Sequence, residues 1–207
     1  MRLLEEKPML LRSQDTMKLT KGSNIYECGE YAILKGYVAC KTGDYLLKIM
    51  REGTFTITEE CLFGKRIQYQ AQSDIHLKQL PILSETNFLQ KQASAESAVM
   101  YHLVRQLDLY ALPVKERVMA FLYWIACEIG EFRYEKCRIP SVLTQVEIAN
   151  YTHCTREYLN GVRRVLIAEQ WLASEKGWVL LDWDRWGAFI YHIETKDTDR
   201  KRLSIFC

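Results

Sequence analysis

The sequence predicts an α+β protein in which an all-β region comes first, a long helix follows, and short helices with a hairpin close the chain. Two changes along the sequence indicate this order. In the first ~85 residues, glycine recurs at intervals of 7 to 11 residues between stretches rich in β-branched and aromatic side chains. From about Glu85 glycine is absent until Gly130, and Ala, Gln, Glu, Leu and Met dominate, which favours helix.

Five segments of the first region have the composition and length of strands. They are residues 31–40, 45–50, 54–58, 67–71 and 75–80. Short strands separated by glycine-containing turns are typical of a small β-barrel or jelly roll. We therefore predict a β-roll domain over residues 1–86.

A long helix, predicted over residues 87–112, carries a narrow apolar stripe. Steps of seven, three, four and three residues place on it Ala93, Met100, Leu103, Leu107 and Tyr110. This spacing predicts a seam that pairs with the same helix of a second copy, giving a homodimer. The alternative is a stripe that packs on the chain's own β-domain. The helix ends at Pro113, which lacks the N–H that a continuing helix requires.

The remaining residues, 113–207, predict a helical domain with a hairpin. A helix over 114–130 would bury one face, formed by Val114, Val118, Phe121, Leu122 and Ile125. Two shorter helices, 144–151 and 155–169, are separated by three residues, the connection of a helix-turn-helix. Residues 173–182 contain a Lys-Gly turn followed by an apolar run, which predicts the hairpin. The apolar side chains of 183–193 predict that the C-terminal stretch docks back on this domain.

The helix over 155–169 separates an apolar face from a basic one. We expect Thr155 to cap its first turn, where free N–H groups favour phosphate. The polar face carries Arg156, Asn160 and Arg164. Arginine can form bidentate hydrogen bonds with the edge of guanine, and asparagine with the edge of adenine. The pattern predicts a DNA-recognition helix. The alternative is a solvated amphipathic helix.

The run TQVEIANYTHCTREYLNGV at 144–162, followed by Trp171-Leu172 and the Lys176-Gly177 turn, resembles the winged helix-turn-helix of the CRP/FNR family of bacterial transcription regulators. Gly29-Glu30, the run ILKGYV at 33–38 and GTF at 53–55 are similar to the family's β-roll signatures. The resemblance implies a cyclic-nucleotide-binding-like β-roll, a long dimerisation helix and a winged helix. It also implies a homodimer that binds double-stranded DNA and regulates transcription. The seven cysteines lack the spacing of a disulfide framework, which predicts reduced thiols in a cytoplasmic protein. RNA polymerase and a small-molecule effector stay open as further partners.

The resemblance also implies roles for individual residues. The family's base readers fall on Arg156 and Glu157, which can bind guanine and accept from cytosine N4. Its phosphate contacts fall on Thr144, Gln145 and, in the wing, Lys176. The family's third base-reading position is glycine here, at Gly161, so its usual half-site is not expected. We expect compensation from Asn160, Arg163 and Arg164, the arginines through phosphate.

The predicted β-roll lacks the residues with which cyclic-nucleotide-binding relatives hold ribose and phosphate. Residues 54–71 contain neither the Gly-Glu pair nor the Arg-Ser or Arg-Thr pair of that motif. Seven cysteines without a CxxC spacing and four scattered histidines predict no iron–sulfur, zinc or haem site. We therefore expect neither a cyclic nucleotide nor another cofactor. An anion at Lys65 and Arg66, and a redox switch at Cys154, stay open as alternatives.

The composition narrows the function classes. The formal charge of +2 excludes binding of nucleic acid by bulk charge alone. The N-terminus has no signal-peptide pattern and no apolar run is long enough to span a membrane, so no membrane contact is expected. Motifs of phosphate loops, nucleophile elbows and zinc proteases are absent, so no enzyme is predicted. The alternative class is an effector-binding or protein-interaction module whose helix-turn-helix no longer reads DNA, an alternative that Gly161 supports.

Overall fold

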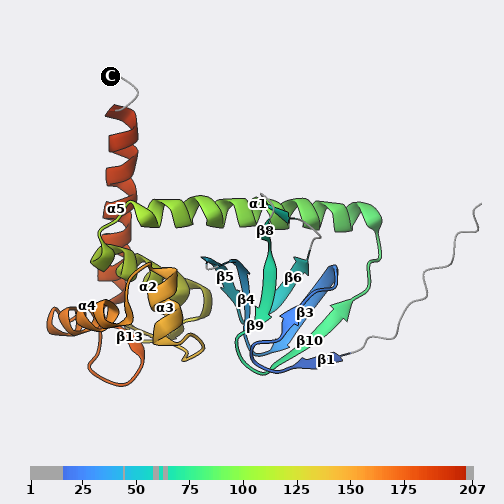
Figure 1. Ribbon diagram of the computed structural model, residues 1–207, viewed down its shortest axis with the longest axis horizontal. Helices are drawn as coiled ribbons and strands as arrows, with labels where there is room; N and C mark the ends of the chain where they lie inside the picture. The colour runs from blue at the N-terminus through green and yellow to red at the C-terminus, as the bar shows by residue number, and fades with distance from the viewer. Residues whose placement is uncertain (1–15, 44, 58–60, 63–64, 204–207) are drawn as a thin grey trace, which may run out of the picture.

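The computed structural model describes residues 16–43, 45–57, 61–62 and 65–203, and at 61–62, 65–66, 194 and 196–203 it describes the backbone. Three parts follow one another along the chain, in the predicted order (Figure 1). A β-roll comes first. The long helix α1 (Glu85–Tyr110) then lies across one side of the roll, and a helical part follows that ends in α5 (Trp183–Leu203).

The β-roll consists of two four-stranded antiparallel sheets and a short ribbon. The first sheet has the order β1 (Thr16–Leu19), β10 (Ile75–Leu80), β3 (Gly29–Lys35) and β6 (Gly53–Ile57). The second has the order β2 (Asn24–Ile25), β9 (Gln68–Ala71), β4 (Val38–Thr42) and β5 (Tyr45–Met50). The ribbon pairs β7 (Cys61–Leu62) with β8 (Lys65–Arg66). All five predicted strand segments fall on strands of the two sheets.

One predicted strand, residues 31–40, is divided between β3 and β4. The division lies at Gly36, whose φ of 92° is open to glycine and strained for other residues. A Cβ at this position would lie 2.5 Å from the carbonyl oxygen of Asp74. The chain therefore turns here and passes from the first sheet to the second.

Stacked aromatic rings fill the interior of the roll. The ring centroids of Tyr31 and Phe55 are 5.6 Å apart, and those of Phe55 and Tyr69 are 5.4 Å apart. All three rings are buried, and Val99 of α1 closes the same cluster from outside. A 2.7 Å ion pair between Lys91 of α1 and the buried Glu30 of β3 adds a polar contact. The roll and α1 thus form one packed unit.

The helical part builds on α2 (Val114–Ile129), whose predicted inner face is buried, with Val114 partly exposed at its start. A three-stranded antiparallel sheet contains β11 (Glu131–Arg133), β12 (Lys136–Ile139) and β13 (Trp178–Leu180). Between β12 and β13 lie two helices, α3 (Gln145–Tyr151) and α4 (Arg156–Ala168). The predicted hairpin is small, because β13 meets the preceding strand segment in a single bridge between Leu172 and Leu180.

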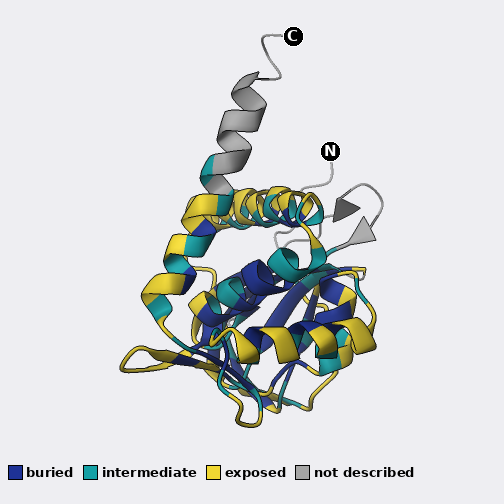
Figure 2. Ribbon diagram, turned by 90° about the vertical axis from the view of Figure 1, so that its left-hand side faces the viewer, coloured by how far each residue is buried: buried dark blue, intermediate teal, exposed yellow. Residues whose placement is uncertain are grey.

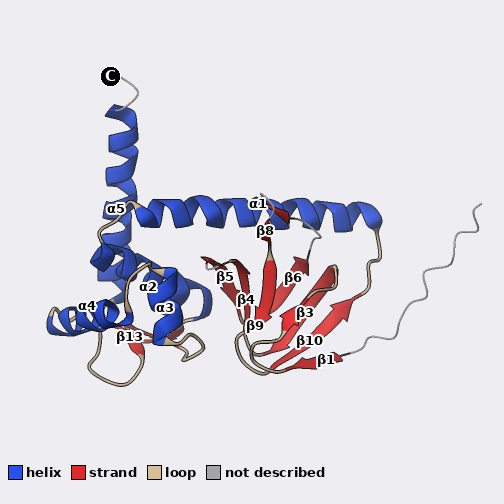
Figure 3. Cartoon of the chain, in the orientation of Figure 1, coloured by secondary structure: helices blue, strands red, loops and turns tan. Residues whose placement is uncertain are grey.

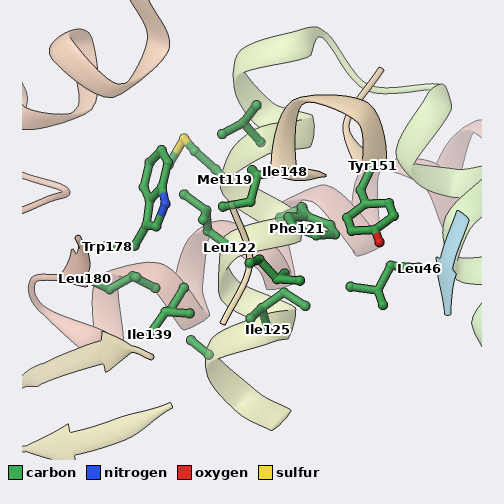
Figure 4. Close-up of a cluster of buried hydrophobic side chains, with 14 of the residues drawn as sticks. Leu46, Met119, Phe121, Leu122, Ile125, Ile139, Ile148, Tyr151, Trp178 and Leu180 are labelled. Carbon is green, nitrogen blue, oxygen red and sulfur yellow. The ribbon is translucent and has the colours of Figure 1, made fainter. Parts of the chain in front are cut away.

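One hydrophobic cluster runs from the helical part into the roll. It contains Phe121 and Ile125 of α2, Tyr151 of α3 and Trp178 of β13, and Leu46 of β5 joins them (Figure 4). All five of these side chains are less than a tenth exposed. The β-roll and the helical part therefore share a core and do not pack as separate bodies.

The start of α5 docks as predicted. Trp186 is fully buried, and its Nε1 donates a hydrogen bond to the carbonyl oxygen of Trp171 at 3.3 Å. Ile190 is also buried, whereas Tyr191 is 71% exposed. The helix then continues past α1 and away from the body (Figures 1 and 2). None of the helices in the described part of the chain has the length and apolarity of a membrane span.

Candidate nucleic-acid interface

The helix α3, one of the helices drawn in blue in Figure 3, begins with a reciprocal cap. The side-chain oxygen of Thr144 accepts a hydrogen bond from the backbone N–H of Glu147 at 3.1 Å, and the Glu147 carboxylate accepts from the backbone N–H of Thr144 at 2.7 Å. This capping box fixes where α3 starts. Thr144 is exposed beside the first helical residue, Gln145, which is partly exposed. Two of the predicted phosphate ligands, Thr144 and Gln145, thus lie at one helix end.

The helix α4 begins shortly after α3 ends, across residues 152–155. Thr155 caps it as predicted, because its hydroxyl oxygen accepts from the backbone N–H of Tyr158 at 3.1 Å. Leu159, Val162 and Leu166 are buried against the shared core. Because this face is buried, the opposite face of α4 is turned to solvent. Figure 1 shows α4 at the outer edge of the helical part.

The solvent face of α4 holds the predicted base readers. Arg156, Glu157 and Arg164 are exposed, and Asn160 is partly exposed. Gly161 lies among them, and a Cβ built there would meet no atom within 4 Å. Packing therefore does not require a glycine at position 161, and a larger side chain would fit there. Next to the helix N-terminus, which favours negative charge, these side chains form a small polar surface with two arginines.

Arg163 has a different position from the one its predicted phosphate role suggests. Its Nη2 donates to the carbonyl oxygens of Glu175, at 2.8 Å, and Gly177, at 3.1 Å. Its guanidinium also lies 5.6 Å from the ring of Trp178. Residues 174–177 form the turn before β13, which we call the wing. Arg163 therefore holds the wing against α4, and Lys176 remains exposed within it.

The turn between α3 and α4 contains a strained residue that sequence reasoning had not assigned to the site. His153 has a φ of 48°, and its Nε2 forms a hydrogen bond with the hydroxyl of Tyr110 at the end of α1. Beside it, the Sγ of Cys154 lies 3.4 Å from the hydroxyl oxygen of Thr152, and Cys154 is partly buried. No local sequence signal marks His153, because its partner is 43 residues away.

The predicted seam on α1 divides between two faces of the helix. Met100 and Leu107 are 47% and 67% exposed, and Ala93 is also exposed. Leu103 instead packs against the core of the roll, and Tyr110 turns towards His153. Two side chains outside the predicted set extend the exposed stripe, Leu89 at 56% and Val104 at 51%. The set that we call the α1 stripe is Leu89, Ala93, Met100, Val104 and Leu107.

A group of ionisable side chains lies where β5, α1 and α2 meet. Glu128 of α2 is packed against β5, and burial raises the pKa of this carboxyl to about 7 even though the Ile49 N–H, Arg105 and Lys48 oppose the rise. Burial lowers the pKa of His102 to about 4, and the positive charges of Arg105 and Lys48 add to this effect. The group surrounds a hollow of about 10 Å³, about the volume that one water molecule needs.

The predicted anion position at Lys65 and Arg66 lies on the β7–β8 ribbon, and its side chains are outside the described residues, as is the N-terminal run 1–15. Within the part of the chain that the structure describes, no three potential metal ligands lie together.

No protein-family model matches the sequence, and no curated protein matches it significantly. The structure, however, resembles solved regulators. A CRP/FNR family transcriptional regulator from Thermus thermophilus, TTHA1359, superimposes with a TM-score of 0.65 at 24% identity, over 84% of this chain and 97% of that one. FixK2 from Bradyrhizobium japonicum gives 0.66 at 14% identity, over 86% and 98%.

A cyclic nucleotide-binding domain containing protein from Listeria monocytogenes EGD-e gives a TM-score of 0.66 at 18% identity, over 83% of this chain and 90% of that one. In each case the match extends from the β-roll into the helical part, since it covers more than four-fifths of the chain. The chain therefore has the fold of the CRP/FNR family of transcriptional regulators.

Proposed function

We propose that the protein is a sequence-specific DNA-binding transcription regulator that acts as a dimer on a roughly palindromic operator, without a cyclic nucleotide. The observation that carries the proposal is the solvent face of α4. There Arg156, Glu157 and Asn160 follow a capped helix N-terminus, and the wing is held beside the same helix by Arg163. In this arrangement α4 can enter a major groove while the wing meets the adjacent backbone.

Each exposed side chain suits one kind of DNA contact. Arg156 can bind a guanine edge through two parallel hydrogen bonds, and Glu157 can accept from the N4 amino group of cytosine. Four further side chains can contact phosphates. Thr144 and Gln145 lie at the start of α3, Arg164 lies on the solvent face of α4, and Lys176 lies in the wing. Because Arg163 already binds two wing carbonyls, we assign it to positioning the wing.

The dimer is supported by the α1 stripe. Ala93, Met100 and Leu107 repeat every seven residues and Val104 lies four residues after Met100, which is the spacing of a coiled-coil seam; Leu89 lies on the same face about one turn before Ala93. The stripe is exposed, whereas Val99 and Leu109 of the same helix are buried against the body. A second copy of the chain, paired along α1, would cover the stripe and present two α4 helices related by a twofold axis. Such a pair reads an inverted repeat.

Two features support independence from cyclic nucleotides. The sequence lacks the ribose- and phosphate-binding pairs, and in the described part of the roll the rings of Tyr31, Phe55 and Tyr69 stack through the interior. A different effector is compatible with both features.

Selection from a random duplex library tests the proposal. We expect the purified protein to enrich an inverted repeat. Arg156→Ala should lose about 1–3 kcal/mol of binding to that repeat, because a bidentate guanine contact is worth this much. Lys18→Ala, which removes an exposed positive charge from β1 of the β-roll, is the control and should bind as the wild type does.

Binding that is salt-sensitive but enriches no sequence would reject base reading. It would favour a module whose helix-turn-helix has lost specificity, and Gly161 is the feature of the chain that agrees with that outcome.

A further inference from the structure

A single guanidinium joins the end of α1 to the turn between α3 and α4. Arg117, in the first turn of α2, donates from Nε to the carbonyl oxygen of Leu109 at 3.2 Å and from Nη2 to those of Leu112 at 3.0 Å and Tyr110 at 3.4 Å. Its Nη1 donates to the carbonyl oxygen of Thr152 at 3.2 Å. The last carbonyls of a helix have no partner within the helix, and here Arg117 supplies one.

A second contact joins the same two places through side chains. The Tyr110 hydroxyl is hydrogen-bonded to Nε2 of His153, and the two ring centroids are 4.5 Å apart. Tyr45 of β5 lies against both rings, 5.6 Å from His153 and 6.0 Å from Tyr110. The guanidinium of Arg117 lies 5.7 Å from the Tyr110 ring. We call Arg117, Tyr110 and His153 the clamp.

The clamp lies between the two surfaces that the proposed function uses. On one side is α1, whose stripe would define the twofold axis of the dimer, and on the other is the turn that leads into α4. In a twofold dimer, the distance between the two α4 helices depends on the angle between α1 and the α3–α4 pair. Half-sites of a helix-turn-helix dimer are read about one helical turn, roughly 34 Å, apart, and one base pair alters this separation by about 3.4 Å.

We infer that the clamp fixes this angle, so that Arg117 and Tyr110 are positioning residues that determine which half-site separation the dimer reads. The inference rests on the proposed function. It assigns specificity to residues that touch no base, since they act through the position of α4. Packing alone gives a different expectation, because the shared core around Phe121 and Tyr151 would then hold the angle without the clamp.

The test measures two affinities separately, one for a single half-site and one for pairs of half-sites at different separations. Wild type, Tyr110→Phe and Arg117→Lys are compared on a single selected half-site and on palindromes whose half-sites differ in separation by one base pair at a time. Tyr110→Phe keeps the ring and removes the hydroxyl, and Arg117→Lys keeps the charge but cannot reach four carbonyls. Tyr134→Phe, on the fully exposed turn between β11 and β12, is the control.

We expect wild type and control to prefer one separation by about tenfold or more over its neighbours, the size of a typical mismatch penalty. Both clamp variants should bind a single half-site with an affinity within about twofold of that of wild type. Their preference for one separation of the half-sites should fall by at least about two-thirds.

An unchanged spacing profile in both variants, with half-site binding retained, would overturn the inference and leave the proposed function standing. A wild type that reads half-sites but prefers no separation would overturn it too. A wild type that selects no sequence refutes the proposed function itself, and the inference falls with it.

Discussion

The side chain of Glu128 on α2 reaches β5, where its Oε2 accepts a hydrogen bond from the backbone N–H of Ile49 at 2.8 Å. β5 is an edge strand of its sheet, so this N–H has no strand partner on that side. A carboxylate from the helical part thus completes the hydrogen bonding of the β-roll. This contact gives the junction a dependence on pH that can be measured.

Between pH 8 and 6.5 we expect the protein to become more stable as pH falls. The folded-state pKa of Glu128, about 7, lies above that of an unfolded carboxyl, so the folded state binds the extra proton in this window. Glu128 should contribute about 0.8 kcal/mol and His102 should offset about half of it, so the net gain measured by urea unfolding should be about 0.4 kcal/mol. His102 opposes this gain within the same window, because its lowered pKa makes the unfolded state bind the proton as the pH approaches 6.5.

Glu128→Gln keeps an acceptor for Ile49 and removes the ionisation, so stability should no longer rise as the pH falls from 8 to 6.5, and His102 should make it fall slightly. Glu131→Gln, at an exposed position on β11, is the control and should keep the rise. A rise that survives in Glu128→Gln would show that another group causes it.

Gly161→Ala should stabilise the protein by about 1 kcal/mol, because alanine is the better helix former in a helix interior. The new Cβ meets no atom within 4 Å. Thermal unfolding should show a higher Tm. Gly130→Ala is the matched opposite, since its Cβ would lie 2.3 Å from the Ala126 carbonyl oxygen and 2.4 Å from the Cys137 Sγ. A loss of stability in Gly161→Ala would mean that the glycine is needed structurally.

Arg163 and Arg164 are neighbours in sequence with different expected roles. Arg163→Met should loosen the wing by about 1 kcal/mol, which corresponds to roughly fivefold faster amide exchange at 174–177. Arg164→Met should leave this exchange unchanged. It should instead lower the slope of log K against log salt by about 0.9, the value for one lost phosphate contact. The reverse assignment of the two effects would contradict our reading of both side chains.

Val104→Glu should convert the proposed dimer to a monomer, because it places a charge in the middle of the α1 stripe. Sedimentation should show a dimer Kd at least about tenfold higher, while the fold is retained. Ser94→Glu, exposed on α1 outside the stripe, is the control. Leu103→Glu should reduce folding instead of dimerisation, since Leu103 packs against the roll. A dimer that tolerates Val104→Glu would place the interface elsewhere.

Much of the fold could be predicted because local rules determine it. Glycine spacing indicates the strands, and the apolar period of 114–130 identifies the buried face of α2. Threonine at 155 identifies the start of α4, whereas the capping box that starts α3 at Thr144 was not predicted. Each of these signals involves residues that are close together in the sequence.

The orientation of α1 depends on residues far away in the sequence. Heptad counting groups Leu103 and Tyr110 with Met100 and Leu107, yet the first pair faces the roll and His153. Which stripe of a helix becomes buried depends on its neighbours in space, and those neighbours come from β5 and the α3–α4 turn. For the same reason, the attachment of Arg163 to the wing could not be read from the sequence, because it joins residues across a loop.

The shared core restricts how this protein can be recombined. Ala39, Leu46 and Ile49 of the second sheet belong to the same cluster as Trp178 and Trp186 at the other end of the chain. A chimera that exchanges the β-roll for that of a relative would have to carry these three side chains with it. The interchangeable unit in this chain is therefore smaller than the roll, and its boundary passes through β4 and β5.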